Sequence, residues 1–295
     1  MKKIAIISWW TSWEREASLE SANNIKSILE KKYIVSIYDY PHEIEFLSKK
    51  YDLYIPIIHG LWWEDGEITN ILENYGKKYL FTSTQGHKIC INKFITNKIV
   101  SNNNLTTPQT YIRTKYNKTN HNITLPVFIK PNKMGSSMFA NIANTNEEVE
   151  IFCQKIINQY DDALIAEYIK GNEISVIVSN ITKETNILSA LRINTDKTFY
   201  TEENKELWKW VLFTPIQIAE IKTIEKSIIN IYNKLQLKDV ARFDFIQKDN
   251  LYYFLEINTI PGMSTHSILH NGLLHTDYKG LENFILQLVK NNIWV

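Results

Sequence analysis

Apolar and polar residues follow two periods in the first part of the chain. Short apolar runs predict strands, and apolar residues spaced by three and four predict helices between them. The strands are expected at residues 3–8, 33–40 and 52–60, and the helices at residues 17–30 and 68–75. Strands that alternate with helices form a parallel sheet, and ligands bind at the carboxyl ends of such strands. We therefore expect the two loops that leave these ends, residues 8–18 and 59–66, to border one crevice.

The pattern changes in the second part of the chain, where strands follow one another in pairs. A helix is predicted first, and the segment TTPQTYI after it marks entry to a new lobe. Further strands are expected at residues 125–131, 137–143, 163–169 and 173–179, and helices at residues 88–103, 219–234 and 281–289. We find no internal repeat and no low-complexity linker.

The most informative segment runs from residue 241 to residue 267. It predicts two strands, ARFDFIQ and LYYFLEIN, joined by a turn at Lys248-Asp249-Asn250. Side chains alternate along a strand, so Arg242 and Asp244 share one face, and Glu256 and Asn258 share a face of the partner strand. Pairing about this turn sets Arg242 opposite Glu256, with Asp244 one step along. The four polar side chains are therefore expected to converge on one patch.

This patch has the composition of a magnesium site. Two carboxylates and an amide that converge on one cation repel each other unless divalent metal ions neutralise them. Oxygen-only ligands suit Mg²⁺, which usually shares its coordination with substrate phosphates. Asp244, Glu256 and Asn258 are the expected ligands.

Composition excludes several other classes of protein. The chain has 295 residues, of which 33 are basic and 32 acidic, and it has no long basic run, so nucleic acid is not an expected partner. Cys90 and Cys153 are far apart and form no CxxC pair, which disfavours a disulfide framework or a zinc site. The apolar run in MKKIAIISWW is too short for a signal peptide, and no stretch is long enough to span a membrane. We therefore expect a cytoplasmic protein without a membrane partner.

Lys130 and the loop after it are candidate phosphate ligands. Lys130 lies inside the apolar run LPVFIKP, where a buried ammonium needs an anion, although a lysine at a sheet edge can extend to solvent instead. The loop Gly135-Ser136-Ser137 can wrap phosphate oxygens with backbone N–H groups and hydroxyls. Most Gly-Ser segments are simple turns, so the loop alone is a weak signal.

Two further carboxylates and one glycine lie where strands begin or end. Glu167 ends an apolar strand at a position suited to a nucleotide ribose or base, and Glu173 opens the next strand. Each of them also fits an ordinary surface carboxylate. Gly262 follows Pro261 shortly after Asn258, so backbone can approach whatever the carboxylates hold.

Together these segments resemble the D-alanine–D-alanine ligase family of the ATP-grasp superfamily. The resemblance runs almost end to end through the blocks SWEREASLES, PIIHGLWWEDGEITNILE, INKFITNK, LPVFIKPNKMGSS, IAEYIKGNEISV, RFDF and FLEINTIPGMSTHS. It implies an α/β protein with α+β lobes, namely an ATP-grasp fold that follows an N-terminal parallel-sheet domain. The implied domains are an α/β substrate domain at residues 1–87, a central ATP-grasp lobe at 88–170 and a C-terminal ATP-grasp lobe at 171–295.

The resemblance also implies a reaction and roles for individual residues. The reaction joins two D-alanine molecules through an acyl phosphate, with ATP and two Mg²⁺ ions, to supply peptidoglycan synthesis, and the protein is expected to be a homodimer. The implied ATP-binding residues are Lys93, Lys130, Ser137, Glu167, Glu173 and Lys205. The implied catalytic residues are Glu14, Ser136, Arg242 and Gly262. The implied residues at the amino-acid subsites are Glu14, His59, Ser267 and Glu206, and the implied metal ligands are Asp244, Glu256 and Asn258.

Three departures from the family pattern affect the expected substrate. Trp9-Trp10 stand in place of a glycine pair, Trp62-Trp63 replace small residues, and Glu206 replaces a tyrosine. The tryptophans, together with Trp13, Trp208 and Trp210, either pack the lobes together or reshape the pocket. A ligase for other amino acids and a catalytically silent ATP-binding protein are therefore the alternatives. His266, His270 and His275 lack a carboxylate or cysteine partner and are expected to be structural.

Overall fold

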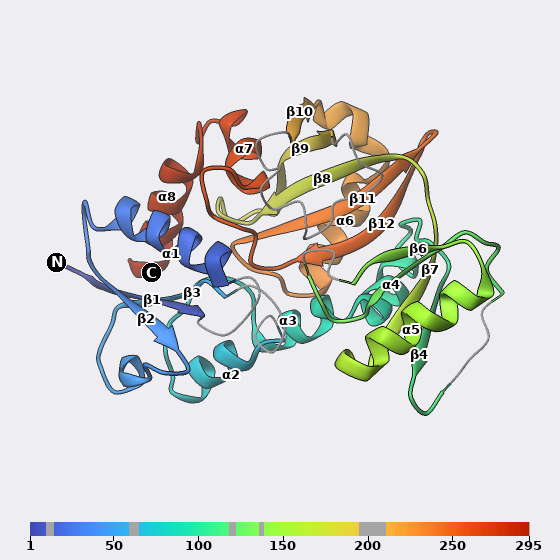
Figure 1. The fold of residues 1–295 in the computed structure, drawn as a ribbon. Helices are drawn as coiled ribbons and strands as arrows, with labels where there is room; N and C mark the ends of the chain where they lie inside the picture. The colour runs from blue at the N-terminus through green and yellow to red at the C-terminus, as the bar shows by residue number, and fades with distance from the viewer. Residues whose placement is uncertain (10–14, 59–64, 118–121, 136–138, 195–210, 295) are drawn as a thin grey trace.

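The first sheet is parallel, as the alternating pattern predicts. The computed structural model describes the chain except residues 10–14, 59–64, 118–121, 136–138, 195–210 and 295, which are grey in Figure 1. The sheet has the order β2-β1-β3 and comprises β1 (Lys3–Trp9), β2 (Ile34–Tyr40) and β3 (Leu53–Pro56). Its helical connections are α1 (Arg15–Leu29), a 3-10 turn η1 (Glu45–Leu47) and α2 (Glu67–Asn74). Each of its strands carries apolar side chains that are almost completely buried.

A second, antiparallel sheet follows in the order β4-β7-β5-β6. Its strands are β4 (Thr110–Thr114), β5 (Val127–Pro131), β6 (Asn141–Ala143) and β7 (Asp162–Glu167). Helix α5 (Asn146–Tyr160), which the sequence reading did not predict, covers one face of this sheet (Figure 1). Val127, Ile129 and Ile165 point toward α5, so Lys130 lies on the opposite face.

The third sheet has five antiparallel strands in the order β10-β9-β8-β11-β12. They are β8 (Asn172–Ser179), β9 (Asn186–Asn194), β10 (Leu212–Ile216), β11 (Val240–Lys248) and β12 (Leu251–Asn258). A 3-10 turn, η3 (Ile218–Ile221), and helix α6 (Lys222–Lys234) cover one face of it. Strands β9 and β10 were not predicted from the sequence.

The helix predicted at residues 88–103 is wrong, because the structure has two helices there. They are α3 (Thr84–Ile91) and α4 (Lys93–Ser101). Asn92 between them is extended, with φ −83° and ψ 91°, and its side chain accepts a hydrogen bond from the Ile95 N–H. An asparagine that caps a helix in this way begins a new helix, so Lys93 becomes the first residue of α4.

The predicted register between β11 and β12 is also wrong. Arg242 lies opposite Asn258, and Asp244 lies opposite Glu256. The turn is shorter by one residue than expected, since Lys248 pairs with Leu251, and a bulge in β12 adds a second one-residue shift. Two such shifts restore the alternation of side chains, so the faces shared by the four polar residues are as predicted.

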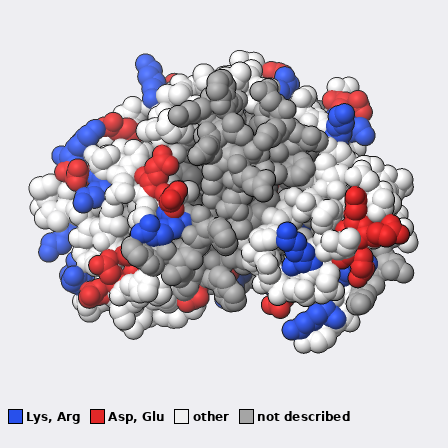
Figure 2. Space-filling view, viewed as in Figure 1, with Lys and Arg blue, Asp and Glu red and all other residues white. Residues whose placement is uncertain are grey.

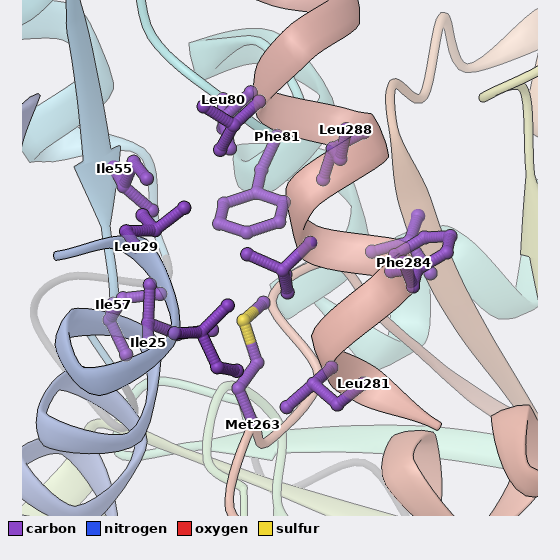
Figure 3. Packing of buried hydrophobic residues seen from close by; sticks show 14 of the residues in the cluster. Ile25, Leu29, Ile55, Ile57, Leu80, Phe81, Met263, Leu281, Phe284 and Leu288 are labelled. Carbon is purple, nitrogen blue, oxygen red and sulfur yellow. The ribbon is translucent and has the colours of Figure 1, made fainter. Parts of the chain in front are cut away.

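The two ends of the chain pack together. Helices α7 (Ile268–Leu274) and α8 (Leu281–Ile293) follow the third sheet, and α8 lies beside α1 (Figure 1). Figure 3 shows Phe81 and Met263 between α1, which carries Ile25 and Leu29, and α8, and all four residues belong to one buried cluster with Phe284 and Leu288 of α8. The first sheet therefore shares one core with C-terminal elements. In the part of the chain that the structure describes, no helix is long and apolar enough to cross a membrane. The domain boundaries given above stay a prediction.

Candidate active site

Two lysines from different elements approach one carboxylate. The Nζ of Lys93, at the start of α4, lies 3.3 Å from Oε2 of Glu256 in β12, and the Nζ of Lys130 in β5 lies 3.9 Å from the same oxygen. Lys93 also donates to the backbone oxygen of Met134, 2.5 Å away. Three separate segments therefore bring two ammonium groups and a carboxylate to one point, between the second and third sheets.

Charge controls the ionisation of these groups. Burial opposes ionisation of Glu256, but nearby Lys93, Lys130 and Arg242 overcome it and lower the pKa of Glu256 to about 2. Burial lowers the pKa of Lys130 to about 8, against the attraction of Glu256. The side chain of Lys130 is only 15% exposed, so the alternative of an ammonium extended to solvent does not describe it. The ammonium groups are thus held where little water reaches them, so they would attract phosphate oxygens strongly.

Arg242 and Asp244 form a rigid pair beside this point. The guanidinium donates to both oxygens of Asp244 at distances of 2.8 to 3.0 Å. Burial favours loss of the Arg242 proton, but the Asp244 carboxylate outweighs it and raises the pKa of Arg242. Ser175, which lies opposite Asp244 in β8 and is fully buried, donates a 2.6 Å hydrogen bond to Oδ1 of Asp244. Sequence reasoning missed Ser175, although its register position on β8 could have indicated it once the strand pairing was known.

Glu173 lies near the same charged groups. It lies in β8 opposite Ile246 of β11, two residues before Ser175, and so on the face that carries Asp244. Burial, followed by the negative charge of Asp244, raises the pKa of Glu173 to about 7. This carboxylate therefore changes charge near neutral pH.

A buried asparagine fixes the place of Lys93. Oδ1 of Asn132 accepts a hydrogen bond from the Phe94 N–H, and the Asn132 carbonyl accepts one from the Lys93 N–H. Nδ2 of Asn132 donates to Asn92 and to Asp162. The residue is completely buried and ties the start of α4 to the ends of β5 and β7. Sequence reasoning missed it as well, because an asparagine after a strand reads as an ordinary turn residue.

The expected metal ligands Asp244 and Glu256 have more cations beside them than the sequence argument counted. Three cations, Lys93, Lys130 and Arg242, surround Asp244 and Glu256. The described residues also contain no cluster of three or more His, Cys, Asp or Glu side chains placed to hold a metal. The donor set nevertheless fits Mg²⁺, because Asp244 and Glu256 face each other and Asn258 adds an amide oxygen on the same face.

Three other expected site residues, Glu167, Gly262 and Ser267, are placed by contacts outside the cluster of Lys93, Lys130 and Glu256. Glu167 is the last residue of β7, its alternation places it on the face that α5 covers, and its side chain accepts a hydrogen bond from the Gln109 N–H. Ser267 is buried and caps α7, where its Oγ accepts from the His270 N–H. A Cβ built on Gly262 would lie 3.7 Å from Cβ of Ser267, so the two residues are adjacent in space.

The remaining expectations lie outside the described residues. They are the roles of Glu14, His59, Ser136, Ser137, Lys205 and Glu206, and the packing of Trp10, Trp13, Trp62, Trp63, Trp208 and Trp210. The side chain of Trp9 lies outside them too. Of the three histidines, His270 accepts a 3.5 Å hydrogen bond from the Leu281 N–H, which agrees with a structural role.

Surface charge is mixed on the face drawn in Figure 2. Basic and acidic side chains are interspersed over the described part of that face, and no extended patch of lysine and arginine gathers there. This agrees with the balanced composition of the chain. Exclusion of nucleic acid stays a prediction.

Comparison with known proteins gives a consistent result. Residues 95–290 match the model of the family described as "D-ala D-ala ligase C-terminus". The chain is 32% identical to a D-alanine–D-alanine ligase of Petrotoga mobilis, with 98% of each chain covered, and 30% identical to one of Fervidobacterium nodosum, with 88% and 89% covered.

Solved structures share the fold. The crystal structure of a D-alanine–D-alanine ligase from Bacillus anthracis, complexed with ATP, matches with a TM-score of 0.84 and 24% identity over 99% of this chain and 97% of that one. The VanG D-Ala:D-Ser ligase of Enterococcus faecalis matches with a TM-score of 0.81 and 22% identity over 98% of each chain.

Proposed function

Because this chain belongs to the D-alanine–D-alanine ligase family, we propose that it joins two D-alanine molecules into a dipeptide for peptidoglycan synthesis, with hydrolysis of ATP to ADP and phosphate. It is an ATP-dependent ligase. The observation that carries the proposal is the approach of Lys93 and Lys130 to Glu256, next to the Arg242–Asp244 pair. This arrangement provides fixed positive charge for phosphates and oxygen ligands for their counterions in one place.

The first step activates a carboxylate. An oxygen of the first D-alanine attacks the γ-phosphorus of ATP, the bond to the β-phosphate oxygen breaks, and an acyl phosphate and ADP form. Lys93 and Lys130 neutralise charge on the phosphate oxygens, and their burial strengthens that interaction. Glu173, Ser137 and Lys205 complete the proposed ATP site, and Glu167, at the end of β7, is assigned to it by the family resemblance alone.

Two Mg²⁺ ions are proposed with ATP. Asp244, Glu256 and Asn258 would hold them, and Ser175 and Arg242 fix the orientation of Asp244. Such ions, when bound, would supply positive charge that neutralises the phosphate oxygens during transfer.

The second step forms the amide bond. The amine of the second D-alanine, once it has lost a proton, attacks the carbonyl carbon of the acyl phosphate, and phosphate leaves with the former carboxylate oxygen. We assign Arg242 and the backbone N–H of Gly262 to the developing oxyanion. Arg242 is suited to this because its guanidinium keeps its charge and is already held by Asp244.

The amino-acid subsites are assigned by the family resemblance. Glu14 is proposed to bind the ammonium of the first D-alanine, with His59, Ser136 and Glu206 beside it. Ser267 is proposed to receive the carboxylate of the second. Its position as the cap of α7, next to Gly262, places it close to the proposed oxyanion donor.

The setting of the enzyme is a proposal too. We place it in the cytoplasm, where ATP is available, as a homodimer whose subunits meet largely through the first lobe. Neither a membrane nor nucleic acid is proposed as a partner.

The test is phosphate release from Mg-ATP by the purified protein with D-alanine, followed by identification of the dipeptide by mass. A panel of other D- and L-amino acids is the control. Release and dipeptide with D-alanine support the proposal. Release with another amino acid alone would replace the substrate, and ATP binding without release by any amino acid would refute ligase activity.

A further inference from the structure

The segment from Asn258 to Met263 carries two groups of the proposed site. It leaves the end of β12 and leads toward α7, and it includes the proposed ligand Asn258 and the proposed oxyanion donor Gly262. After Asn258, the last residue of β12, residues 259–263 lie outside helices and strands, so no ladder of hydrogen bonds fixes their peptide planes. The contacts that hold them must come from other elements.

Helix α1 holds the Met263 peptide groups from both sides. The Met263 N–H donates a 3.1 Å hydrogen bond to Oγ of Ser21, and Nδ2 of Asn24 donates a 2.7 Å hydrogen bond to the Met263 carbonyl. Ser21 and Asn24 are three residues apart, so they lie on the same face of α1. Ser21 is 1% exposed and Met263 is completely buried.

The side chain of Met263 adds a third point of attachment. It lies in the core between α1 and α8, beside Ile25 and Leu281 (Figure 3). The backbone and the side chain of one residue are thus fixed at the same time. A residue held in this way cannot rotate without breaking buried hydrogen bonds and packing.

The other end of the segment is held by a different helix. Nδ1 of His87 in α3 lies 2.7 Å from Oγ1 of Thr259, and both residues are buried. The Ile260 N–H donates to Oδ1 of Asn258, which closes a local turn. Gly262 therefore lies between a fixed Thr259 and a fixed Met263.

We propose that Ser21 and Asn24 are positioning residues for the second chemical step, because they fix the backbone next to Gly262 so that its N–H stays directed at the oxyanion. This inference rests on the proposed function. Gly262 has no side chain to restrict its dihedral angles, so its N–H keeps one direction only while its neighbours are held. Neither residue touches substrate in this role; each acts through Met263.

The test compares Ser21→Ala and Asn24→Ala with the wild-type enzyme. Three quantities are measured: kcat for dipeptide formation, KM for ATP, and the inhibition constant of a phosphinic acid analogue of D-alanyl-D-alanine, which mimics the tetrahedral intermediate. Ser27→Ala is the matched control, because Ser27 lies on the same helix and its exposed hydroxyl donates to the Asn24 carbonyl.

Misdirection of one oxyanion donor is expected to lower kcat on the order of 10- to 100-fold in both variants. The inhibition constant of the analogue should rise by a similar factor, because the analogue needs the same donor. KM for ATP should not change, and Ser27→Ala should match the wild type in all three quantities.

Two results would overturn the inference while the proposed function stands. In one, wild-type enzyme makes the dipeptide and both variants keep kcat and analogue binding. In the other, the variants lose ATP binding and analogue binding together with folded protein, which would make the contacts purely structural. Should Ser21→Ala not fold, Asn24→Ala carries the same test, since Asn24 is only partly buried. Absence of dipeptide with the wild-type enzyme would instead refute the proposed function.

Discussion

The ammonium of Lys93 lies 3.3 Å from the carboxylate of Glu256, and this contact joins the start of α4 to β12. The Lys93 side chain is 5% exposed, so Glu256 rather than water is the counter-ion beside its ammonium. Substitution of Glu256 by Gln should therefore affect both stability and activity.

For Glu256→Gln we expect a loss of about 1–3 kcal/mol in the free energy of unfolding, since a buried ammonium loses its partner at a partly exposed site. Turnover should fall at least about 100-fold because one proposed metal ligand loses its charge. Urea unfolding and phosphate release measure the two effects. The double variant Lys93→Met with Glu256→Gln should regain stability but not activity, and recovered activity would contradict the assignment.

Loss of the Lys130 proton should make the activity of the enzyme fall at alkaline pH. Its pKa of about 8 means that the free enzyme loses this positive charge as the pH rises above that value. We expect kcat/KM for ATP, which reports on the free enzyme, to fall by up to about tenfold per pH unit above the pKa. Lys130→Arg stays charged throughout this range and should remove the decline. An identical decline in Lys130→Arg would assign it to another group.

Ser175 should influence metal affinity through Asp244. Ser175→Ala removes the 2.6 Å hydrogen bond to Oδ1 of Asp244. We expect the Mg²⁺ concentration for half-maximal activity to rise about 10- to 100-fold, as is typical when a residue that orients a metal ligand is removed. The control is Ser179→Ala on the same strand, because Ser179 is also buried but bonds to the backbone of Asp239. An equal rise in both variants would refute a specific role for Ser175.

Ionisation of Glu173 is expected to lower the stability of the fold but to favour ATP binding. Its pKa rises from 4.5 to about 7 on folding, so the folded state holds the proton more tightly than the unfolded state between these values. Stability therefore falls as the pH rises through this window, and the charged carboxylate costs stability above it. Glu173→Gln should raise the free energy of unfolding by up to about 3 kcal/mol at pH 8 and leave it unchanged near pH 4. KM for ATP should increase at pH 8. Thermal unfolding at both pH values tests the sign, and destabilisation at pH 8 would contradict it.

Periodicity was enough to predict the parallel first sheet and most strands of the second and third. It failed at residue 92, where one asparagine caps a new helix inside an apolar pattern that continues on both sides. Helix α5 was missed although Thr145 caps it by accepting a hydrogen bond from the Glu148 N–H. Its apolar residues Val149, Cys153 and Ile156 are separated by polar residues, so the helical period is weak. The predicted register was wrong because the turn is one residue shorter than expected and a bulge near Phe254 has no sequence signal of its own.

The charged residues of the site were predicted from the sequence. The neutral residues that hold them in place by hydrogen bonds were not. Lys93, Lys130 and Glu256 stand out in apolar or family-like segments. Ser175, Asn132 and the pair Ser21–Asn24 matter only through contacts between segments that are distant in the chain. Such contacts depend on the tertiary arrangement, which composition and periodicity do not contain. The charge argument for magnesium did not include Lys93 and Lys130, which reach Glu256 from other elements, and the magnesium site stays a prediction.

The central claim is that the carboxylate of D-alanine is activated by phosphoryl transfer. The most direct measurement supplies D-alanine labelled with ¹⁸O in its carboxylate, together with Mg-ATP, and determines the label in the released phosphate by mass spectrometry. An acyl phosphate transfers one carboxylate oxygen to phosphate for each dipeptide formed, so the account predicts one ¹⁸O per phosphate. Unlabelled phosphate formed alongside the dipeptide would contradict it.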